Sequence, residues 1–556
     1  MREKISSILE KFVPLKKSEI NDLIEIPPSL NLGDYALPCF ILSKKLKKEP
    51  AEIAKELARK IKSKEFEKIE ANGPYLNFFI DSRYLTEQTL SRIVKEREKY
   101  GSSNIGKGKK ILIEMSSPNI AKPFGIGHLR STIIGNSISN ICSFLGYKTI
   151  RLNYLGDWGT SSGKILAGYK HFGSEKALKL NPLHHLYDIY VKTSKDEKFE
   201  ELGRQWFKKL ESGDKEAVKT WRKFREISVK EFNKIYKSLD IKFDVISGES
   251  LYDKKINSVV LDLKKKDLIK RSEGADIIDL NKYALGVALV RKSDGTTLYV
   301  TRDIAAAIDR YKKYKFERMF YEVGQEQKLH FKQLFKILEL LGCKWVKSCA
   351  HIDHGLYLDK DGRKFATRTG KTVFMADILE ETKKLAKIEI SKRGKLPIKY
   401  LEKRAQAIAI ASIFYGDLKN HRSNDIVFDI NRFVSFEGNT GPYLLYTYAR
   451  ARNILRKAKY NPKLRYKIEK LSDAEKSIIS ELNKFGEVVY QSYISLSPNL
   501  IANYAYTLSQ IFNEFYHSCP VIGSENEQFR LALVDSTSQV IKNSLNLLGI
   551  STLESL

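Results

Sequence analysis

Hydrophobic and polar positions in the middle of the chain follow a pattern that predicts alternating strands and helices. Residues 111–115 are a short, mostly apolar run, and residues 129–145 then place apolar side chains on one helical face. Gly146 can end that helix, and residues 148–155 form the next apolar run. The unit recurs as strand 297–301 with helix 304–314, and as strand 319–323 with helix 329–341. Repeats of this kind predict an α/β fold, in which helices cover a parallel sheet.

The segments on either side of this region have different patterns. Residues 1–95 combine helical stretches with one strand at residues 75–80, directly after Gly73-Pro74, and we expect a small α+β domain there. Residues 395–556 show helical periodicity almost throughout, which predicts an all-helical bundle. The α/β domain between them would span residues 96–394, with a charged helical insertion at about 160–240.

Composition narrows the class of protein. No apolar run approaches the ~20 residues that a membrane span needs. The first residues lack the apolar core of a secretory signal, and Glu3 and Glu10 are untypical of a transit peptide. The five cysteines form no C-x-x-C pair, which argues against a zinc ribbon and fits a reducing compartment. We therefore expect a cytoplasmic protein with neither zinc nor a membrane partner.

The charge balance points to a polyanionic partner. Lys and Arg number 97 against 67 Asp and Glu, which gives a formal net charge of +30. An excess of this size attracts polyanions such as nucleic acid over long range. The alternative is a lysine-rich composition whose charges only solvate the surface, and the charge alone does not decide between the two.

The loop after the first strand of the sheet, residues 116–128, carries candidate chemistry. Ligands of open α/β sheets bind at the carboxyl ends of strands, where a helix N-terminus offers free N–H groups to phosphate. Gly125 and Gly127 allow close approach to the backbone, and Lys122 and His128 can donate to a phosphate that gains charge. The alternative is an ordinary strand–loop–helix connection with a surface histidine and lysine.

Two familiar nucleotide motifs are excluded by spacing. The pattern Gly125-x-Gly127 begins like a dinucleotide fingerprint, but its third glycine position is Arg130. The run Gly370-Lys371-Thr372 ends like a P-loop, but the required first glycine falls at Phe365.

Longer stretches of the chain resemble one enzyme family. Residues 124–132 are similar to the HIGH-type signature of class I aminoacyl-tRNA synthetases, and residues 114–159, which end in Asn-Tyr-Leu-Gly-Asp-Trp-Gly, resemble arginyl-tRNA synthetases in particular. Ile26-Pro27-Pro28 with residues 33–36, and residues 436–443, resemble the N-terminal and helical anticodon domains of that family. Several motifs in the right order, nearly end to end, imply a Rossmann-type catalytic domain between those two domains.

The resemblance implies a second catalytic segment at residues 364–371, the position of the family's KMSKS-type loop. A mobile basic loop can close over a triphosphate and stabilise departing pyrophosphate. The alternative is a solvated, charged hairpin around Asp361-Gly362. The implied catalytic residues are Lys122, His128, Lys364 and Arg368, and the implied ATP-binding residues add Phe124, Gly125, Gly127, Thr367 and Lys371.

Two departures from the family pattern stand out. Gly125 occupies the place of the first signature histidine, which leaves only His128. In the second segment Ala366 and Thr367 replace the usual serine and second lysine. Family members that lack that lysine tend to carry one upstream of the first signature, where this chain has Lys122.

Arginine recognition has candidates in both the residue pattern and the resemblance. Glu114 interrupts an apolar strand, and a buried carboxylate needs a partner such as the planar guanidinium of arginine. The alternatives are an internal ion pair with a protein arginine for Glu114 and a helix N-cap for Asp303. The resemblance implies that Glu114, Tyr299 and Asp303 bind the guanidinium, while Ser117, Asn119 and Gln327 bind the polar end of the amino acid.

The expected contacts with RNA lie in the two outer domains. Residues 443–452 interleave aromatic residues with arginines, which suits stacking on unpaired bases, although an aromatic core face would give the same pattern. Candidate contacts are Tyr443, Tyr446, Arg450 and Arg452 in the helical domain and Asn77 and Phe79 near the N-terminus.

The resemblance thus implies an arginine–tRNA ligase that uses ATP with Mg²⁺, L-arginine and tRNA-Arg, and we expect a monomer. Two alternatives remain open on the sequence. One is a tRNA-binding protein of the same fold that has lost activation, for which Gly125 is the best support. The other is a class I synthetase for a different amino acid, against which the paired carboxylates Glu114 and Asp303 argue.

Overall fold

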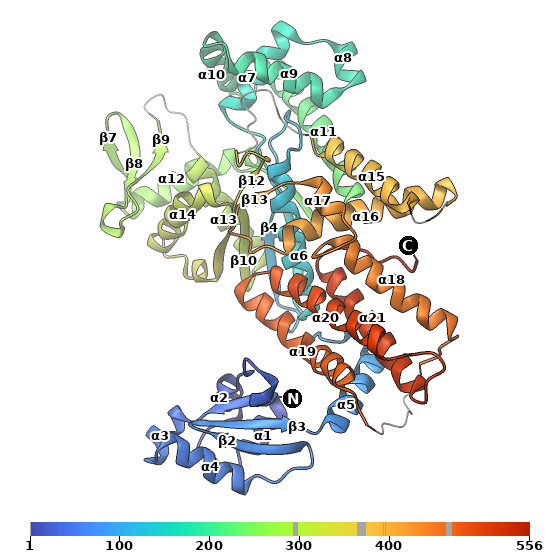
Figure 1. The fold of residues 1–556 in the computed structure, drawn as a ribbon. Coiled ribbons are helices and arrows are strands. Elements are labelled where there is room, and N and C mark those ends of the chain that lie inside the picture. The colour runs from blue at the N-terminus through green and yellow to red at the C-terminus, as the bar shows by residue number, and fades with distance from the viewer. Residues whose placement is uncertain are drawn as a thin grey trace. The chain divides into compact units, whose positions relative to one another are not determined.

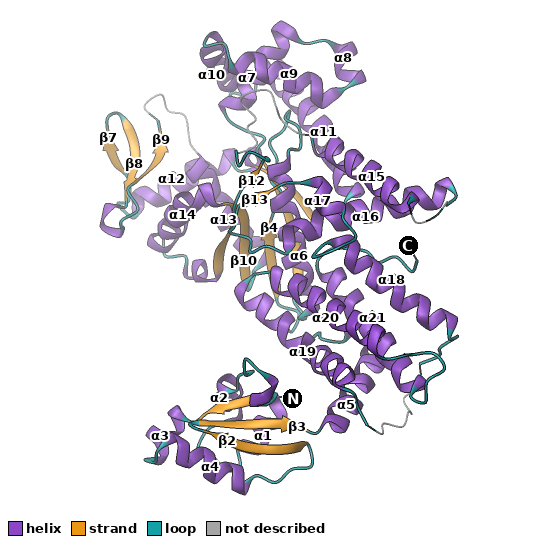
Figure 2. Cartoon of the chain, viewed as in Figure 1, coloured by secondary structure: helices purple, strands orange, loops and turns teal. Residues whose placement is uncertain are grey.

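The computed structural model describes residues 2–292, 299–363, 374–392, 394, 396–462 and 470–555 (Figures 1 and 2). The chain forms two compact units. One comprises Met1–Tyr100, Ile454–Lys484 and Gln510–Val540, and the other comprises Gly101–Asn453, Phe485–Ser509 and Ile541–Leu556. Each unit is described by itself below.

The N-terminal part of the first unit is a small α+β domain. Its elements are α1 (Arg2–Leu9), α2 (Lys17–Leu23), β1 (Tyr35–Pro38), α3 (Phe40–Leu46), α4 (Pro50–Lys60), β2 (Phe66–Asn72), β3 (Tyr75–Ile80) and α5 (Ser82–Glu96). The strands form an antiparallel sheet in the order β1-β3-β2. Leu76, Phe78 and Ile80 alternate along the central strand and are buried, which is the pattern of a sheet with one face in the core. The strand predicted at residues 75–80 is confirmed.

The second unit is built on a parallel sheet, seen among the helices in Figure 2. Its strands are β4 (Lys110–Glu114), β5 (Lys148–Leu155), β6 (Val245–Gly248), β10 (Arg318–Gly324) and β11 (Cys349–His354). They pair in parallel in the order β11-β10-β4-β5-β6. All carboxyl ends therefore lie at one edge, and the chain reverses its direction of progress beside β4, where α/β sheets bind ligands. The predicted α/β fold is confirmed.

Helix α6 (Ile126–Phe144) follows β4 and lies directly against it. Every apolar residue of the predicted helical face is buried, from Leu129 to Leu145. A Cβ added at Gly135 would lie 2.5 Å from the side chain of Met115, so this glycine permits the close approach of α6 to the end of β4. The packing fixes the helix that carries the signature residues at its first turn.

Helices fill the insertion between β5 and β6. They are α7 (Thr160–Phe172), α8 (Glu175–Leu180), α9 (Pro182–Ser194), α10 (Lys198–Glu211) and α11 (Lys215–Ser238), and α7 to α10 lie together at the top of Figure 1. Their buried apolar residues include Ile165, Leu186, Phe207 and Phe224, which pack into a core of their own. The insertion is therefore a folded helical body joined to the sheet through α11.

The other elements of the second unit extend and cover the sheet. They are α12 (Ile256–Lys265), β7 (Lys270–Ser272), β8 (Ala275–Asp279), β9 (Val287–Arg291), α13 (Tyr299–Tyr314), α14 (Lys328–Leu340), β12 (Tyr357–Leu358), α15 (Met375–Ser391), α16 (Ile398–Leu418), β13 (Ile426–Val427) and α17 (Ile430–Val434). Strands β7, β8 and β9 form a separate antiparallel sheet that the sequence patterns did not reveal.

The expected strand at residues 297–301 is wrong for the residues that can be compared. Residues 293–298 lie outside the described chain, and Tyr299 is already the first residue of α13. Val300 and Thr301 favour strands by propensity, yet both are buried in the helix, and the Thr301 hydroxyl donates to the Val290 carbonyl at 3.0 Å. Tertiary packing therefore overrides local preference here. Asp303 lies inside α13, so it is not the N-cap that the sequence allowed.

The C-terminal region is helical, as expected. It contains α18 (Gly441–Lys457), α19 (Asp473–Ser495), α20 (Asn499–Ser518) and α21 (Glu527–Leu547), and α19 and α20 each contribute residues to both units. Within the described ranges, no helix is long and apolar enough to cross a membrane.

Close helix packing in the insertion yields a stability prediction. A Cβ at Gly163 of α7 would lie 2.0 Å from the Gly203 carbonyl oxygen of α10, and a backbone atom cannot move aside as a flexible side chain can. We expect Gly163→Ala to destabilise the insertion by about 1–3 kcal/mol and to lower the melting temperature.

The matched control is Gly486→Ala in α19, where an added Cβ makes ordinary contacts at 3.6 Å. Alanine in a helix interior is favoured over glycine by about 0.5–1 kcal/mol, so this variant should melt at the same temperature or higher. Equal melting temperatures for Gly163→Ala and the control, measured by circular dichroism, would contradict the prediction.

Candidate active site

A cavity of about 420 Å³ opens at the carboxyl ends of β4 and β10. All six residues predicted to bind arginine line it: Glu114, Ser117, Asn119, Tyr299, Asp303 and Gln327. The sequence reasoning missed the other lining residues, which are Tyr154, Gly156, Glu249, Arg310, Tyr321, Val323, His330 and Phe331. The structure thus brings together residues from five separate stretches of the chain, as a ligand site at a sheet edge requires.

Helix α13 supplies one wall of the cavity by its periodicity. Tyr299, Asp303 and Arg310 are spaced by four and seven residues, which places them on one helical face. Gln327 and His330 follow β10 and are spaced by three residues at the start of α14. The helical spacing could have revealed Arg310 in the sequence, had α13 been recognised as beginning at Tyr299.

Three carboxylates line the cavity, and each has a basic partner within the chain. Glu114 forms an ion pair with Arg310 at 2.5 Å, and Glu249 forms one with Arg302 at 3.4 Å. The His330 Nε2 lies 2.7 Å from a carboxylate oxygen of Asp303. The internal ion pair that the sequence left open for Glu114 is therefore what the structure shows.

Burial sets the protonation of these groups. Burial raises the pKa of Glu114, and the charge of Arg310 opposes the rise. Burial also raises the pKa of Glu249 to about 8, with Arg302 opposing and the charges of Asp303 and Asp157 adding to it. A carboxylate cluster that resists ionisation when empty favours a cationic ligand, because the ligand's charge makes full ionisation less costly.

His330 completes the electrostatics of this wall. Burial by itself lowers the pKa of His330, but its hydrogen bond to Asp303 and the charges of Asp303 and Glu114 outweigh burial and leave the pKa raised. The imidazole therefore holds a proton beside Asp303 more firmly than a free histidine does, and it competes with any cation that approaches that carboxylate.

Some polar atoms in the cavity are available to a ligand. The Ser117 and Tyr154 hydroxyls are buried and have no hydrogen-bond partner among the described residues. Arg310 is 2 % exposed, and its guanidinium lies over the rings of Tyr154 and Tyr321, at 4.7 and 5.8 Å from their centroids. Buried hydroxyls without partners are costly in a folded protein, and a bound polar ligand would satisfy them.

The loop between β4 and α6 holds a conformation that few residues adopt. Ser116, Ser117 and Ala121 all have positive φ angles, of 74, 46 and 56°. Gly156 approaches this loop so closely that a Cβ there would lie 2.0 Å from the Asn119 side-chain oxygen. Backbone strain of this kind persists only where the surroundings enforce it, and it is concentrated at functional sites.

His128 is held in one tautomer at the first turn of α6. Its Nδ1 accepts a hydrogen bond from the Gly125 backbone N–H at 3.2 Å, so the proton of the neutral ring is on Nε2. Burial, with a contribution from the charge of Lys122, lowers the pKa of His128 to about 4. A neutral imidazole with Nε2–H is a hydrogen-bond donor at physiological pH, as the predicted phosphate contact requires.

The other predicted ATP residues differ in position. Gly127 is exposed at the start of α6, and Gly125 forms a backbone bridge with Phe374. The Lys122 ammonium lies 4.0 Å over the Tyr190 ring of α9. Phe124 is 1 % exposed, and its ring contacts Phe232 and Tyr236. Its contact with ATP stays a prediction. The predicted residues Lys364, Thr367, Arg368 and Lys371 lie outside the described chain.

The predicted RNA contacts are unequal. In α18, Tyr443, Tyr446 and Arg450 are partly exposed on one helical face, and the Arg450 guanidinium lies 4.8 Å from the Tyr446 ring centroid. Arg452 lies on another face and pairs with Glu554 at 2.9 Å.

In the N-terminal domain, Phe79 is partly exposed, with Lys68 5.4 Å from its ring centroid. Asn77 is 4 % exposed, so its side chain does not offer the surface that the expected contact needs.

Family models match three consecutive parts of the chain. The model for the class I (R) tRNA synthetase catalytic domain matches residues 89–430, the arginyl-tRNA synthetase N-terminal domain matches residues 1–80, and the DALR anticodon-binding domain matches residues 444–556. The catalytic model alone covers more than half of the chain.

The chain belongs to the arginine–tRNA ligase family of class I tRNA synthetases. Arginine–tRNA ligase of Clostridium perfringens is 43% identical over 560 residues, which cover 99% of both chains. That of Ligilactobacillus salivarius is 42% identical over 98% of both. The solved arginyl-tRNA synthetase of Plasmodium falciparum is 25% identical, with a TM-score of 0.81 over 100% of this chain and 99% of that one.

Membership of the family makes the chain an aminoacyl-tRNA synthetase, and the family uses ATP as a substrate. The arginyl-tRNA synthetase of Thermus thermophilus has the same fold, with a TM-score of 0.81 at 24% identity over 100% of this chain and 99% of that one. The cavity at β4 and the first turn of α6 thus lie within the part that matches the synthetase catalytic model.

The tautomer of His128 is open to direct measurement. With histidine labelled in ¹⁵N, His128 should show the Nε2–H tautomer at pH 7 and should titrate near pH 4, because burial disfavours the cation. Lys122→Ala should raise this pKa toward the ordinary value near 6.5 without reaching it, since Lys122 is the smaller of the two causes. His128→Gln identifies the signal, and an Nδ1–H tautomer would contradict the hydrogen bond to Gly125.

Proposed function

We propose that the cavity at β4 and β10 binds the arginine that this arginine–tRNA ligase attaches to tRNA-Arg. The observation that carries the proposal is the group of three carboxylates, Glu114, Glu249 and Asp303, around a cavity of about 420 Å³ that the loop between β4 and α6 borders. Arginine brings one guanidinium cation and a polar amino-acid end, and the cavity offers carboxylates on one side and free hydroxyl and amide groups on the other.

The guanidinium would bind between α13 and the end of β4. Asp303 and Tyr299 are accessible from the cavity, whereas the carboxylate of Glu114 is shared with Arg310. Two carboxylates at an angle fit the planar, five-donor guanidinium and not the single ammonium of lysine, which gives specificity by geometry. The charge of Arg310 opposes the effect of burial on Glu114 and so favours the ionised carboxylate that a guanidinium would meet.

The amino-acid end would bind next to the signature loop. The Ser117 hydroxyl has no partner in the described structure, and the side chains of Asn119 and Gln327 border the same cavity. Their positions would direct the substrate carboxylate toward the N-terminus of α6, where ATP phosphates are favoured by the helix dipole and free N–H groups.

The reaction proceeds in two steps. A carboxylate oxygen of arginine attacks the α-phosphorus of ATP, which enters as its Mg²⁺ complex, and pyrophosphate leaves with the electrons of the broken P–O bond. The Nε2–H of His128, Lys122, Lys364 and Arg368 would stabilise the charge that develops on the phosphates. A terminal ribose hydroxyl of tRNA then attacks the adenylate carbonyl, and AMP leaves. Positioning and charge stabilisation supply most of the catalysis.

The tRNA would approach along partly exposed aromatic and basic side chains. Tyr443, Tyr446 and Arg450 form a stacking stripe at the start of the region that matches the DALR model, which begins at residue 444. The net charge of +30 favours the approach of RNA. We further infer that tRNA must bind before arginine is activated, and that the enzyme acts in the cytoplasm as a monomer.

The function is tested by arginine-dependent ATP–pyrophosphate exchange, with and without tRNA-Arg. We expect exchange only when tRNA is present. Exchange without tRNA would leave the activity intact and refute the tRNA requirement. Folded protein that binds tRNA and shows no exchange in either condition would refute activation and favour a binding protein. Exchange driven by another amino acid and not by arginine would refute the assignment of the cavity.

The pH dependence of arginine binding tests the role of Glu249. Its pKa of about 8 means that the carboxyl is largely neutral at pH 7 and largely ionised at pH 8.5. Because the ionised form attracts the guanidinium, KM for arginine should fall about threefold to tenfold over this range. Glu249→Gln should flatten the profile, measured by exchange at saturating ATP and tRNA.

The matched control is Glu317→Gln, which neutralises an exposed carboxylate that pairs with Lys109 at 2.8 Å, next to the amino end of β10. It should keep the wild-type pH profile. An unchanged profile for Glu249→Gln would show that this carboxylate does not meet the substrate's guanidinium.

A further inference from the structure

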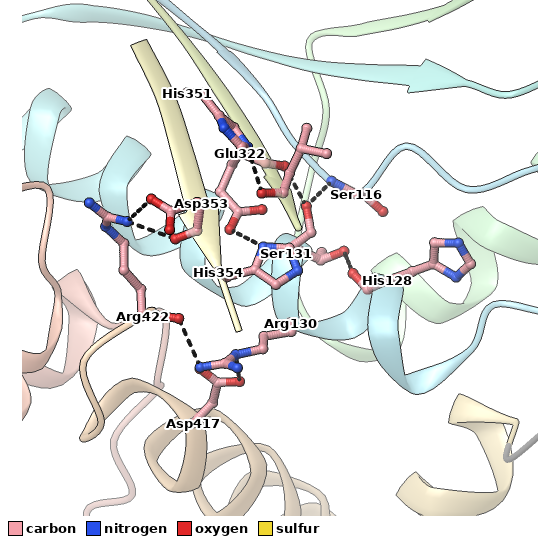
Figure 3. A network of polar contacts seen from close by, with 12 residues as sticks. Ser116, His128, Arg130, Ser131, Glu322, His351, Asp353, His354, Asp417 and Arg422 are labelled. Carbon is pink, nitrogen blue, oxygen red and sulfur yellow. Dashed lines mark hydrogen bonds and ion pairs between the residues drawn. The ribbon is translucent and has the colours of Figure 1, made fainter. Parts of the chain in front are cut away.

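Arg130 is a full charge buried beside the proposed catalytic centre. It lies on α6 two residues after His128 and is 1 % exposed. Figure 3 shows its side chain directed toward Asp417 of α16, whereas the ring of His128 points away from this group. Burying a guanidinium is costly even when it is paired, so its contacts need an explanation beyond packing.

The guanidinium joins three segments that are distant in sequence. Its Nε lies 3.4 Å from the Asp417 carboxylate at the end of α16. Its two terminal nitrogens donate to the carbonyls of Leu356 at 3.3 Å and Arg422 at 3.0 Å. The Tyr357 hydroxyl donates to the same carboxylate, which closes the group. One planar side chain on α6 thus contacts acceptors both after β11 and at the end of α16. The single ammonium of a lysine cannot reach them all at once.

The segments that Arg130 joins to α6 meet at the end of β11. Leu356 and Tyr357 follow β11 and precede along the chain the basic residues 364–371. The Arg422 guanidinium donates to the Asp353 carbonyl at 2.7 Å and to its carboxylate at 2.9 Å, so the turn after α16 also holds the end of β11.

The next residue on α6, Ser131, joins the helix to the sheet. The Ser131 hydroxyl donates to the Glu322 carbonyl of β10 and accepts from the Ser116 N–H after β4, both at 2.9 Å (Figure 3). Ser131 therefore fixes the first turns of α6 to the sheet, and Arg130 fixes them to the segment that leads into residues 364–371. Both ties act within three residues of His128.

We propose that Arg130 is a positioning residue for arginine activation, which fixes His128 relative to the end of β11 and the turn after α16 through Asp417, Leu356 and Arg422. The proposal rests on the proposed function of the site. It requires the fork of the guanidinium and not its charge alone, because two of its three contacts are with backbone carbonyls.

The test compares Arg130→Lys with Arg151→Lys. Arg151 of β5 also donates to α6, through Ser139 at 2.8 Å and Asn140 at 2.7 Å, but at the half of the helix away from His128. In arginine-dependent exchange with saturating tRNA, Arg130→Lys should lower kcat about 10-fold to 100-fold per folded molecule. KM for arginine should change less than threefold, and Arg151→Lys should leave both constants near wild type.

A kcat for Arg130→Lys equal to that of Arg151→Lys, once corrected for the folded fraction, would overturn the proposal. If Arg130→Lys does not fold, kcat of Asp417→Asn is compared with that of Arg151→Lys instead. We expect Asp417→Asn to lower kcat about threefold to tenfold. The same Asn variant with unchanged kcat would also overturn it.

Amide hydrogen exchange separates this proposal from the proposed function, because it requires no activity. Arg130→Lys should increase exchange both at residues 126–129 and at residues 355–358, relative to Arg151→Lys. Increased exchange in both segments would support the positioning role even if wild-type protein failed to activate arginine. Unchanged exchange in either segment would overturn it.

Discussion

The ion pair between Glu114 and Arg310 is the interaction on which the cavity proposed for arginine depends. A carboxylate at the end of a central strand is buried by the same packing that forms the sheet, so it would be neutral without a cation beside it. Arg310 supplies that cation from α13, the helix that also presents Asp303 and Tyr299. The chain thus places the guanidinium of Arg310 beside the carboxylates that are proposed to bind the guanidinium of the substrate. A site of this kind is electrostatically complete before the substrate arrives, and the substrate competes with, or adds to, a network that already exists.

At the start of α6, where the phosphates of ATP are proposed to bind, contacts within the chain also prepare a side chain before the ligand arrives. His128 donates from Nε2 because its other nitrogen is occupied by the Gly125 N–H, and burial keeps the ring neutral. The backbone N–H of Gly125 therefore fixes the tautomer of His128. Glycine at position 125 offers no side-chain donor to a phosphate, which is the loss of one contact. The other tautomer of His128 would also remove the Nε2–H donor. This argument favours an active enzyme over a protein that only binds tRNA.

The sequence predicted the parts of the molecule whose information is local or repeated. Strand–helix alternation predicted the parallel sheet, and the six residues that the family resemblance implied for arginine line one cavity. The failures have one physical origin, which is that distant contacts overrode local preference. Val300 and Thr301 favour a strand but are buried in α13, and that error concealed the helical spacing of Asp303 and Arg310. Glu249 and His330 enter the cavity only through tertiary folding.

The buried charges divide into two groups with different tasks. Glu114, Asp303 and Glu249 face the cavity, and their basic partners leave part of each carboxylate open to a ligand. Arg130 and Asp417 face each other, and Arg130 also contacts backbone carbonyls. Replacing such a closed pair by apolar residues often leaves a protein as stable as before, so stability alone is a weak reason to keep it. An apolar pair cannot form the directional hydrogen bonds by which the Arg130 guanidinium fixes α6, the segment after β11 and the end of α16 relative to one another. A reaction that depends on positioning needs such fixed relative positions.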